Sequence, residues 1–400
     1  MASIHRPLEK ESYYHGLISR DDVNELLKNE GDFLVSKAKP KDGAPLMNIL
    51  SVCCNNKAWD EARRNQHLTI TFLRNKYFVK KYSFDTVQQM IEYHLASKEA
   101  VQDGVTIKSP VIRQSWQLER ESIVVQNKLR DGEFGDISMG TYYKQDGFIL
   151  DVAVKQARFE KLSSAQAKKF MGEARILRTL SHPNIIKCHG VVTGLDPVYL
   201  VTEQAPTLSD YLDNHPNLPM LILDEMCLQA AWGLEYLHSK GIIHRELTAM
   251  YCIYQRDTVK IADFRSAYQG YSYQGEMKQP VLIVLIAPEC LFTRLYTQKT
   301  DVWSFGMLCV KIYSNGAELY PGMPTEELIS RVYYREVADI PANVNPKIAQ
   351  MITEECFSYS PNDRSPMNEI CRMLQTITGI ERPNFDGEPP KVEKDKKKDK

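Results

Sequence analysis

The sequence predicts an α+β protein with two folded units, a small sandwich followed by a larger unit. Its 400 residues are enough for two to three domains. Short strand-like runs between two amphipathic helix patterns fill the first hundred residues, and no internal repeat follows them. The composition, 43% hydrophobic and 25% charged residues, is ordinary for a soluble globular protein.

The charge and cysteine content narrow the compartment and the partners. A formal net charge of -1 creates no overall field that attracts nucleic acid, so we expect no nucleic-acid partner. The nine cysteines show no metal-ligand spacing, which favours free thiols in a reducing compartment. The longest apolar run, residues 281–287, is too short to cross a bilayer. We therefore expect a cytoplasmic protein without a transmembrane segment.

The first unit, residues 11–110, begins with a helix signal. Ser19 can cap a helix, Asp22 lies three residues on, and Val23 starts an apolar face. Strand-like runs follow at residues 32–35, 48–52, 67–72 and 77–79. A second helix is predicted to start near Ser83, with Phe84 on its apolar side. The pattern predicts a central antiparallel sheet flanked by two helices.

The segments YYHGLISR, GDFLVSK and NILSV, then His67 and YHLA, resemble an SH2 domain over this whole unit. The resemblance implies binding of phosphotyrosine proteins and other signalling partners. Where the family has the arginine that forks onto the phosphate, this chain has Ser36. Losing that charge-assisted pair costs roughly 2–3 kcal/mol. Arg20 and His67 match the rest of the pocket, so we expect weak or absent phosphotyrosine binding; the alternative is a docking module with a vestigial pocket.

A linker at residues 111–122 leads to the second unit, residues 123–379. Gly132 and Gly135 fit a hairpin that lies close over phosphates. Period-two alternation places Ala153 and Lys155 on one face of the next strand. Glu173 shares the apolar side of a following helix, where a carboxylate needs a partner, and Lys155 is the candidate.

The later segments IIHRE, VKIADF, APE and DVWSFG, followed by Arg364, complete a resemblance to a protein kinase in order and spacing. FMGEARIL, SHPNII and SNGAELYPGM are similar to the Fes/Fer branch of non-receptor tyrosine kinases. The resemblance implies a bilobal fold with a β-rich first lobe and an α-rich second lobe. It also implies ATP and Mg²⁺ as cofactors. The ATP site would comprise Leu129, Gly132, Gly135, Ile137, Ala153, Lys155, Glu173, Glu203, Ala205 and Ile253.

The chain departs from the family pattern at the reacting groups. Asp263 would hold the metal, but Glu246 stands where the family has its catalytic aspartate. Tyr251 replaces the asparagine that binds a second Mg²⁺, and Arg265 replaces the glycine after Asp263 and Phe264. These changes favour a pseudokinase whose need for Mg²⁺ is reduced or dispensable. The alternatives are an active tyrosine kinase with Glu246 as a weak base, and an adaptor that acts through the SH2 unit.

Three further features are each compatible with two interpretations. Tyr268, Tyr271 and Tyr273 are either phosphorylation sites or ordinary surface tyrosines. The apolar run 281–286 is a buried strand or a docking surface. The Lys-rich tail, residues 380–400, is a disordered solvated segment or a contact to an acidic partner or the inner face of the plasma membrane.

Overall fold

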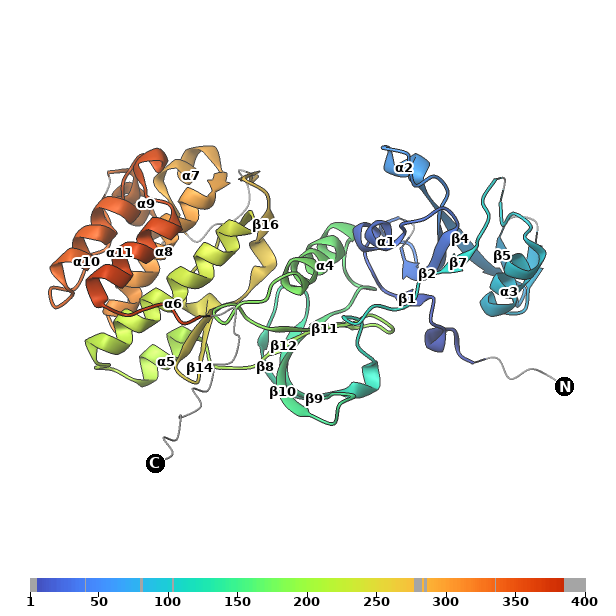
Figure 1. The fold of residues 1–400 in the computed structure, drawn as a ribbon, viewed down its shortest axis with the longest axis horizontal. Helices are drawn as coiled ribbons and strands as arrows, with labels where there is room; N and C mark the ends of the chain where they lie inside the picture. Colours follow the sequence, from blue (N-terminus) through green and yellow to red (C-terminus); the bar gives the residue numbers. More distant parts are fainter. Residues whose placement is uncertain are drawn as a thin grey trace, which may run out of the picture. The chain divides into compact units, whose positions relative to one another are not determined.

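The chain forms two compact units in a computed structural model that describes residues 6–39, 41–79, 82–102, 104–276, 283, 286–334 and 336–384. The first unit comprises Met1–Thr179 and Lys187–Gln204, and the second comprises Leu180–Ile186 and Ala205–Lys400. The first unit thus holds the sandwich, the linker and the β-rich lobe (Figure 1). Most of the predicted apolar run at 281–286, and residues 385–400 of the predicted tail, lie outside the described residues.

The sandwich is built on a sheet with the strand order β1-β2-β3-β4-β5-β6, and β7 pairs with β2. From β2 to β6 the pairing is antiparallel, whereas β1 and β7 each add to β2 in parallel. The elements are β1 (Tyr14–Gly16), α1 (Arg20–Leu26), β2 (Asp32–Ala38), β3 (Met47–Cys53), α2 (Glu61–Arg64), β4 (Asn65–Leu73), β5 (Lys76–Val79), β6 (Tyr82–Phe84), α3 (Val87–Ser97) and β7 (Ser109–Pro110).

The two flanking helices start where their caps allow. The Ser19 hydroxyl accepts a hydrogen bond from the Asp22 backbone N–H, so α1 begins at the predicted residue. The second helix begins later than predicted, because Thr86 caps α3 and the preceding Tyr82–Phe84 pairs with β5 as strand β6. Phe84 therefore lies on a strand and not on the helix face.

One face of this sheet carries the core of the sandwich. Alternate residues of β2, Phe33 and Val35, are fully buried against α3, as period-two alternation requires. The cluster also contains Leu50, Val52, Leu68, Ile70, Val87, Met90 and Ile91. The opposite face of β2 presents Leu34 and Ser36, so Ser36 points away from this core.

The β-rich lobe is a five-stranded antiparallel sheet in the order β11-β12-β10-β9-β8, with one long helix. Its elements are β8 (Ile123–Asp131), β9 (Asp136–Tyr143), β10 (Ile149–Ala157), α4 (Ser164–Arg178), β11 (Cys188–Val192) and β12 (Val198–Glu203). Ser163 and Gln166 form a capping box that starts α4. The linker joins the sheet because the Val191 N–H donates to Trp116 and the Leu118 N–H donates to Val191.

The second unit is mostly helical. Its helices are α5 (Leu208–Asn214), α6 (Met220–Ser239), α7 (Pro288–Thr293), α8 (Gln298–Tyr313), α9 (Thr325–Tyr333), α10 (Pro346–Met351) and α11 (Met367–Thr378). Short antiparallel pairs join β13 (Ile242–Ile243) with β16 (Tyr268–Gln269), β14 (Cys252–Gln255) with β15 (Thr258–Ile261), and β17 (Ser272–Gln274) with β18 (Leu295–Thr297). α6 and α8 form its buried centre. Within the described part of the chain, no helix is long and apolar enough to span a membrane.

Candidate functional site

One group of the predicted ATP-site residues lies in the first unit and centres on Lys155. Its Nζ donates to Glu173 Oε2 at 2.6 Å, and the two side chains are only 12% and 4% exposed. Strand alternation in β10 and the apolar stripe of α4 bring them together, as the sequence indicated. A buried lysine–carboxylate pair holds the ammonium at one place.

The glycine-rich turn between β8 and β9 is closed by a hydrogen bond from the Gly132 N–H to the Gly135 carbonyl, 2.9 Å long. Gly135 approaches the β10 backbone so closely that a Cβ would meet the Gln156 carbonyl oxygen at 2.6 Å. Phe134, at the tip, is buried edge-on against Phe170 of α4. The turn is therefore attached to the helix that carries Glu173.

The remaining predicted ATP-site residues divide between the two units. Leu129 is 48% exposed at the end of β8, while Ile137 and Ala153 are half-buried on β9 and β10. Glu203 ends β12, where its Oε1 accepts from the Lys187 N–H at 2.6 Å. The units divide between Gln204 and Ala205, next to these predicted residues. Ala205 and Ile253 therefore belong to the second unit.

In the second unit, a buried aspartate positions the predicted catalytic loop. Asp301 Oδ2 accepts from the His244 N–H at 2.7 Å, and Oδ1 accepts from the Arg245 N–H at 2.8 Å. The His244 ring, fully buried, bonds to the Ala262 carbonyl at 2.9 Å. The loop is thus fixed to α8 and to the chain before Asp263. Elsewhere in this unit, Arg364 and Glu289 form a bidentate pair at 2.7 and 2.8 Å.

Arg265 lies beside the predicted metal ligand and the residue in the catalytic aspartate position. Its Nη2 is 2.9 Å from Asp263 Oδ2, and its Nε is 3.9 Å from Glu246 Oε2. The guanidinium carbon also lies 4.6 Å from the centre of the Tyr251 ring, as in a cation–π contact. Asp263, Glu246 and Tyr251 therefore surround a positive charge that the family pattern does not contain.

This arrangement leaves little for a metal ion. Asp263 Oδ1 is buried and has no hydrogen-bond partner among the described residues, so it could be one ligand. The other oxygen is already bound to the guanidinium, and Tyr251 offers a phenol where the family has an amide. Over the described part of the chain, no three His, Cys, Asp or Glu side chains gather in a metal-binding group. The residues do not fit the two-metal arrangement of protein kinases.

The phosphotyrosine pocket predicted in the sandwich is weakly charged. Ser36 is only 3% exposed, on the same sheet face as Ser51 and His67. The His67 ring bonds to the Ser51 hydroxyl at 2.9 Å, and burial, with the nearby charge of Arg20, lowers the pKa of His67 to about 4. His67 is therefore neutral near pH 7, and Arg20 is the one cation among the three predicted pocket residues.

The three predicted phosphorylation sites lie on the segment after Asp263. Tyr271 is 86% exposed and Tyr268 is 39% exposed, while Tyr273 is half-buried. The Arg245 guanidinium carbon lies 3.8 Å from the centre of the Tyr273 ring and 4.7 Å from that of Tyr296. In this structure the Arg245 guanidinium thus contacts two aromatic faces and donates to the Ser266 carbonyl at 2.9 Å.

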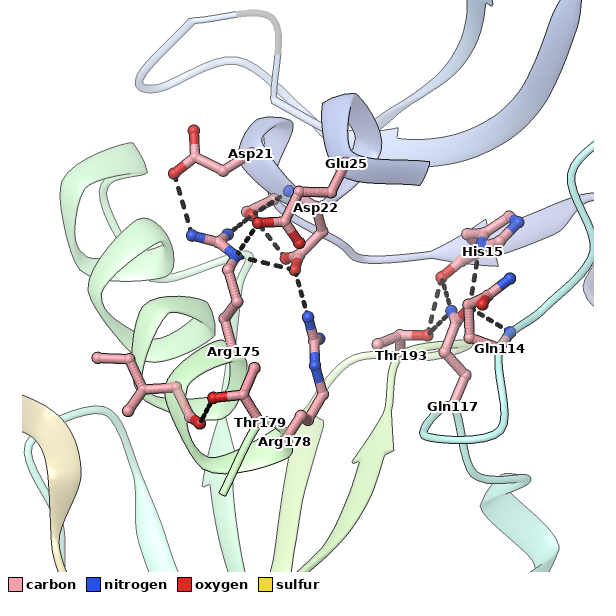
Figure 2. A network of polar contacts seen from close by, with 12 residues as sticks. His15, Asp21, Asp22, Glu25, Gln114, Gln117, Arg175, Arg178, Thr179 and Thr193 are labelled. Carbon is pink, nitrogen blue, oxygen red and sulfur yellow. Dashed lines mark hydrogen bonds and ion pairs between the residues drawn. The ribbon is translucent and has the colours of Figure 1, made fainter. Parts of the chain in front are cut away.

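Sequence reasoning did not predict the polar network that joins α1 to α4 (Figure 2). Asp22 is fully buried, and its Oδ1 accepts from Arg175 Nε at 3.2 Å and from Arg178 Nη2 at 2.9 Å. Burial alone would raise the pKa of Asp22, but the hydrogen bond and charge of Arg175, with the charge of Arg178, hold it below its usual value. Asp22 and Arg175 are separated by 153 positions in the sequence, and no local pattern predicts this contact.

A second contact of the same kind surrounds His15. The Thr193 hydroxyl donates to the His15 carbonyl at 2.8 Å (Figure 2). The His15 ring bonds to the Gln117 side chain at 2.8 Å and to the Val111 carbonyl at 2.9 Å. The Trp116 ring lies 3.8 Å from the guanidinium carbon of Arg178. The linker is therefore packed between the sandwich and the β-rich lobe.

Comparison with known proteins identifies both domains. Residues 13–94 match the SH2 domain, and residues 123–374 match the protein tyrosine and serine/threonine kinase family. The chain is 32% identical over 380 residues to Fer-related kinase 1 of Caenorhabditis elegans, covering 94% of this chain and 95% of that protein. It is 33% identical to mouse tyrosine-protein kinase Fer, where it covers 93% of this chain but only 44% of that protein. It is also 33% identical to the transforming protein Fps of avian sarcoma virus, covering 94% of this chain and 69% of that protein. The chain therefore belongs to the Fes/Fer family of tyrosine kinases, with an SH2 domain followed by a protein kinase domain.

Proposed function

We propose that this member of the family is a pseudokinase: a signalling scaffold that keeps a nucleotide site but has impaired phosphotransfer. The observation that carries the proposal is the position of Arg265, 2.9 Å from Asp263 and 3.9 Å from Glu246. The two carboxylates expected to act in phosphotransfer, those of Asp263 and Glu246, are therefore both close to the Arg265 guanidinium.

The physical argument concerns positioning. Phosphoryl transfer depends almost entirely on placing the nucleophile and on metal and other charges aimed at the transferring group. Glu246 carries its carboxylate one methylene further out than aspartate, and a misplacement of about 1 Å can cost on the order of a hundredfold in rate. One oxygen of Asp263 is already paired with Arg265, and Tyr251 offers a phenol. Both features should lower the phosphotransfer rate further. The intact pair of Lys155 and Glu173 supports retained nucleotide binding.

An active protein-tyrosine phosphotransferase with Glu246 as a weak base is the second candidate. It is favoured by the support of the catalytic loop, where Asp301 accepts from the His244 and Arg245 N–H groups. A loop held this firmly keeps Glu246 at a defined place.

Phosphotransfer by the purified chain, measured beside Asp263→Ala, separates the two candidates. For a pseudokinase we expect nucleotide binding without phosphotyrosine in either protein. Phosphotyrosine that forms with the intact chain and disappears in Asp263→Ala would establish the second candidate. Binding would be followed by thermal shift with ATP.

We further propose that nucleotide binding depends little on Mg²⁺, because the Arg265 guanidinium supplies positive charge at Asp263. The thermal shift with ATP should be nearly the same with Mg²⁺ and with EDTA. In Arg265→Gly the shift should require Mg²⁺, because the metal then has to supply that charge. A shift of the unaltered chain that needs Mg²⁺ would rule this out.

For the SH2 domain we propose weak or absent phosphotyrosine binding, with signalling proteins as the partners. Ser36 and a neutral His67 support it. Submicromolar affinity for a phosphotyrosine peptide in a titration would contradict it.

We also propose that the protein acts in the cytoplasm and that its Lys-rich tail contacts anionic membrane. Sedimentation with phosphatidylserine vesicles, before and after removal of residues 385–400, tests the membrane contact.

The exposed Tyr271 and its neighbours Tyr268 and Tyr273 remain proposed phosphorylation sites. The ring contact between Arg245 and Tyr273 supports Tyr273, because the guanidinium is already adjacent to the side chain that would carry the phosphate. Mass spectrometry of the protein purified from its own cells would show which of the three is modified.

A further inference from the structure

An exposed apolar surface lies on the second unit where α7 meets α9 (Figure 1). Its four side chains are between 39% and 70% exposed, and they are Phe292, Ile329, Tyr333 and Tyr334. The Phe292 ring lies edge-on to the Tyr333 ring, with 5.8 Å between the centroids, and Tyr333 lies edge-on to Tyr334 at 5.0 Å. We call these four residues the α7–α9 surface.

The packing of α9 onto its unit does not account for this surface. Leu328 and Val332, four positions apart, are the buried residues of the helix. Ile329 and Tyr333 each follow one of them, so they form a second stripe about 100° further round the helix. A surface helix usually carries polar residues on such a stripe. Contiguous exposed apolar side chains mark interaction sites more often than isolated ones do.

The charge beside the α7–α9 surface is negative. Glu326 lies three positions before Ile329, on the same stripe, and Glu327 is next to it. Both carboxylates are exposed, and within the described residues no ion pair engages either of them. The one cation of α9, Arg331, pairs with Glu336 at 3.6 Å. Acidic residues also stabilise the first turn of a helix, so the charge gains its meaning from the apolar stripe beside it.

Apolar side chains beside two available carboxylates favour one kind of occupant. An anionic membrane surface would be repelled by the carboxylates. In a symmetric pair of two copies of this chain, the same patch would meet itself and bring like charges together. A partner that carries apolar side chains next to Lys or Arg is complementary to both parts of the surface.

We propose that the α7–α9 surface binds a segment of a partner protein in which apolar side chains are flanked by Lys or Arg. The apolar side chains pack against Phe292 and Tyr333, and the basic groups pair with Glu326 and Glu327. Aromatic residues supply much of the binding energy at protein interfaces, so the two rings are the anchors. No residue of this surface belongs to the predicted ATP site or to the reacting groups. The binding therefore does not depend on whether phosphotransfer is impaired.

The test uses the full chain and fluorescence anisotropy with three labelled peptides of equal length. The first has leucine and tryptophan flanked by lysines, the second has glutamates in place of the lysines, and the third has serines in place of the apolar residues. We expect saturable binding of the first peptide, and at least about tenfold weaker binding of the second and of the third. Added salt should weaken binding of the first peptide, because exposed ion pairs are screened.

Two variants locate the site. Phe292→Ser with Tyr333→Ser should weaken binding of the first peptide at least about tenfold, because both anchors are lost. Glu326→Gln with Glu327→Gln should weaken it about threefold to tenfold and should reduce its dependence on salt, because two exposed ion pairs are lost. Thermal unfolding checks that both variants remain folded.

Each variant has a matched control outside the surface. Phe148 and Tyr143, on the β9–β10 hairpin, are 65% and 48% exposed, close to the 58% and 52% of Phe292 and Tyr333. Phe148→Ser with Tyr143→Ser therefore removes the same side chains at equal exposure. Two exposed carboxylates of the SH2 domain provide the charge control, Glu30→Gln with Glu92→Gln. Both controls should bind the first peptide as the unaltered chain does.

Three outcomes of the peptide experiment would overturn the proposal. One is that the unaltered chain shows no saturable binding of the first peptide. Another is equal weakening in a control, which would make the binding a property of any exposed ring or carboxylate. The third is unchanged binding after loss of the two anchors.

Two further measurements separate the other occupants. Analytical ultracentrifugation of the unaltered chain should show no dimer that Phe292→Ser with Tyr333→Ser dissociates. A dimer of this kind would assign the surface to a second copy. Sedimentation with phosphatidylserine vesicles should be the same for the unaltered chain and this variant, and a loss in the variant would assign the surface to a membrane.

Discussion

Arg265 follows Asp263 and Phe264 in the chain, in a short turn that starts from a left-handed Asp263 with φ 56°. That turn brings the guanidinium back onto the carboxylate of the residue two positions earlier. A glycine at this position would leave both carboxylate oxygens of Asp263 open. The sequence showed that a cation was present, but only the turn shows that it lies on Asp263 and beside Tyr251.

Gly16 offers a test of the contact between the SH2 domain and the β-rich lobe. Its φ is +64°, and a Cβ would lie 2.1 Å from the Thr193 carbonyl oxygen. Gly16→Ala should therefore lower the stability of the first unit by roughly 2–4 kcal/mol, from left-handed strain and from the displaced Thr193. Thermal or urea unfolding measures it.

Gly43 provides the matched control, because its φ is +80° but no atom lies within 4 Å of the added Cβ. Gly43→Ala should cost only the conformational part, about 1 kcal/mol. Equal losses in the two variants would mean that the close approach to Thr193 contributes nothing.

His67 gives the first unit a dependence on pH. Its pKa is about 4 in the folded protein, against 6.5 for the ordinary group, so the folded state resists a proton that the unfolded chain accepts. The contribution of His67 to the free energy of unfolding should be fully present above about pH 6.5 and should be lost as the pH is lowered towards about 4. His67→Gln should flatten the decline of the unfolding temperature over this interval, and an unchanged decline would assign it to other groups.

Elements with a clear period could be predicted from the sequence, and elements fixed by their neighbours could not. The stripe of α4 placed Glu173 beside the strand of Lys155, because each pattern fixes a face. The apolar residues around Phe84 fitted a helix equally well, and pairing with β5 made them a strand. Short apolar runs do not separate these cases by periodicity alone.

The contact between α1 and α4 leads to a prediction about one buried carboxylate. Asp22 is fully buried and pairs with both Arg175 and Arg178. Asp22→Asn therefore removes the carboxylate that faces Arg178 and leaves Arg175 with only the more exposed Asp21 and Glu25. The loss should be about 3–5 kcal/mol, seen as a lower unfolding temperature.

Asp21 is the control for this change. It is 35% exposed and pairs with Lys168 and Arg175 at 3.3 and 3.4 Å. Asp21→Asn should cost less than about 1 kcal/mol, because surface pairs contribute little. If the two variants lose the same stability, the burial of Asp22 is not what makes the network strong.

Over the whole molecule, the division of the chain does not follow the two domains that the sequence marks. Motifs separate an SH2 domain from a kinase domain, whereas contacts join the SH2 domain, the linker and the β-rich lobe in one unit. The joining groups include Gln117, Thr193, Asp22 and Arg178, which lie outside the quoted motifs. They also include His15 and Arg175, which lie inside motifs that do not indicate their partners. Such pairs cannot be read from one sequence, because nothing local distinguishes a buried partner from a solvated charge.

This division predicts which elements lose protection from hydrogen exchange when one contact is removed. In Asp22→Asn, amide hydrogen exchange should quicken not only in α1, where the residue lies, but also in α4 and β11, because the three share one cooperative unit. Peptides from α6 and α11, in the centre of the second unit, should keep their protection, and mass spectrometry resolves both sets. Faster exchange confined to α1 would mean that the SH2 domain unfolds by itself. The same faster exchange in α6 and α11 would mean that the chain behaves as one cooperative body rather than two.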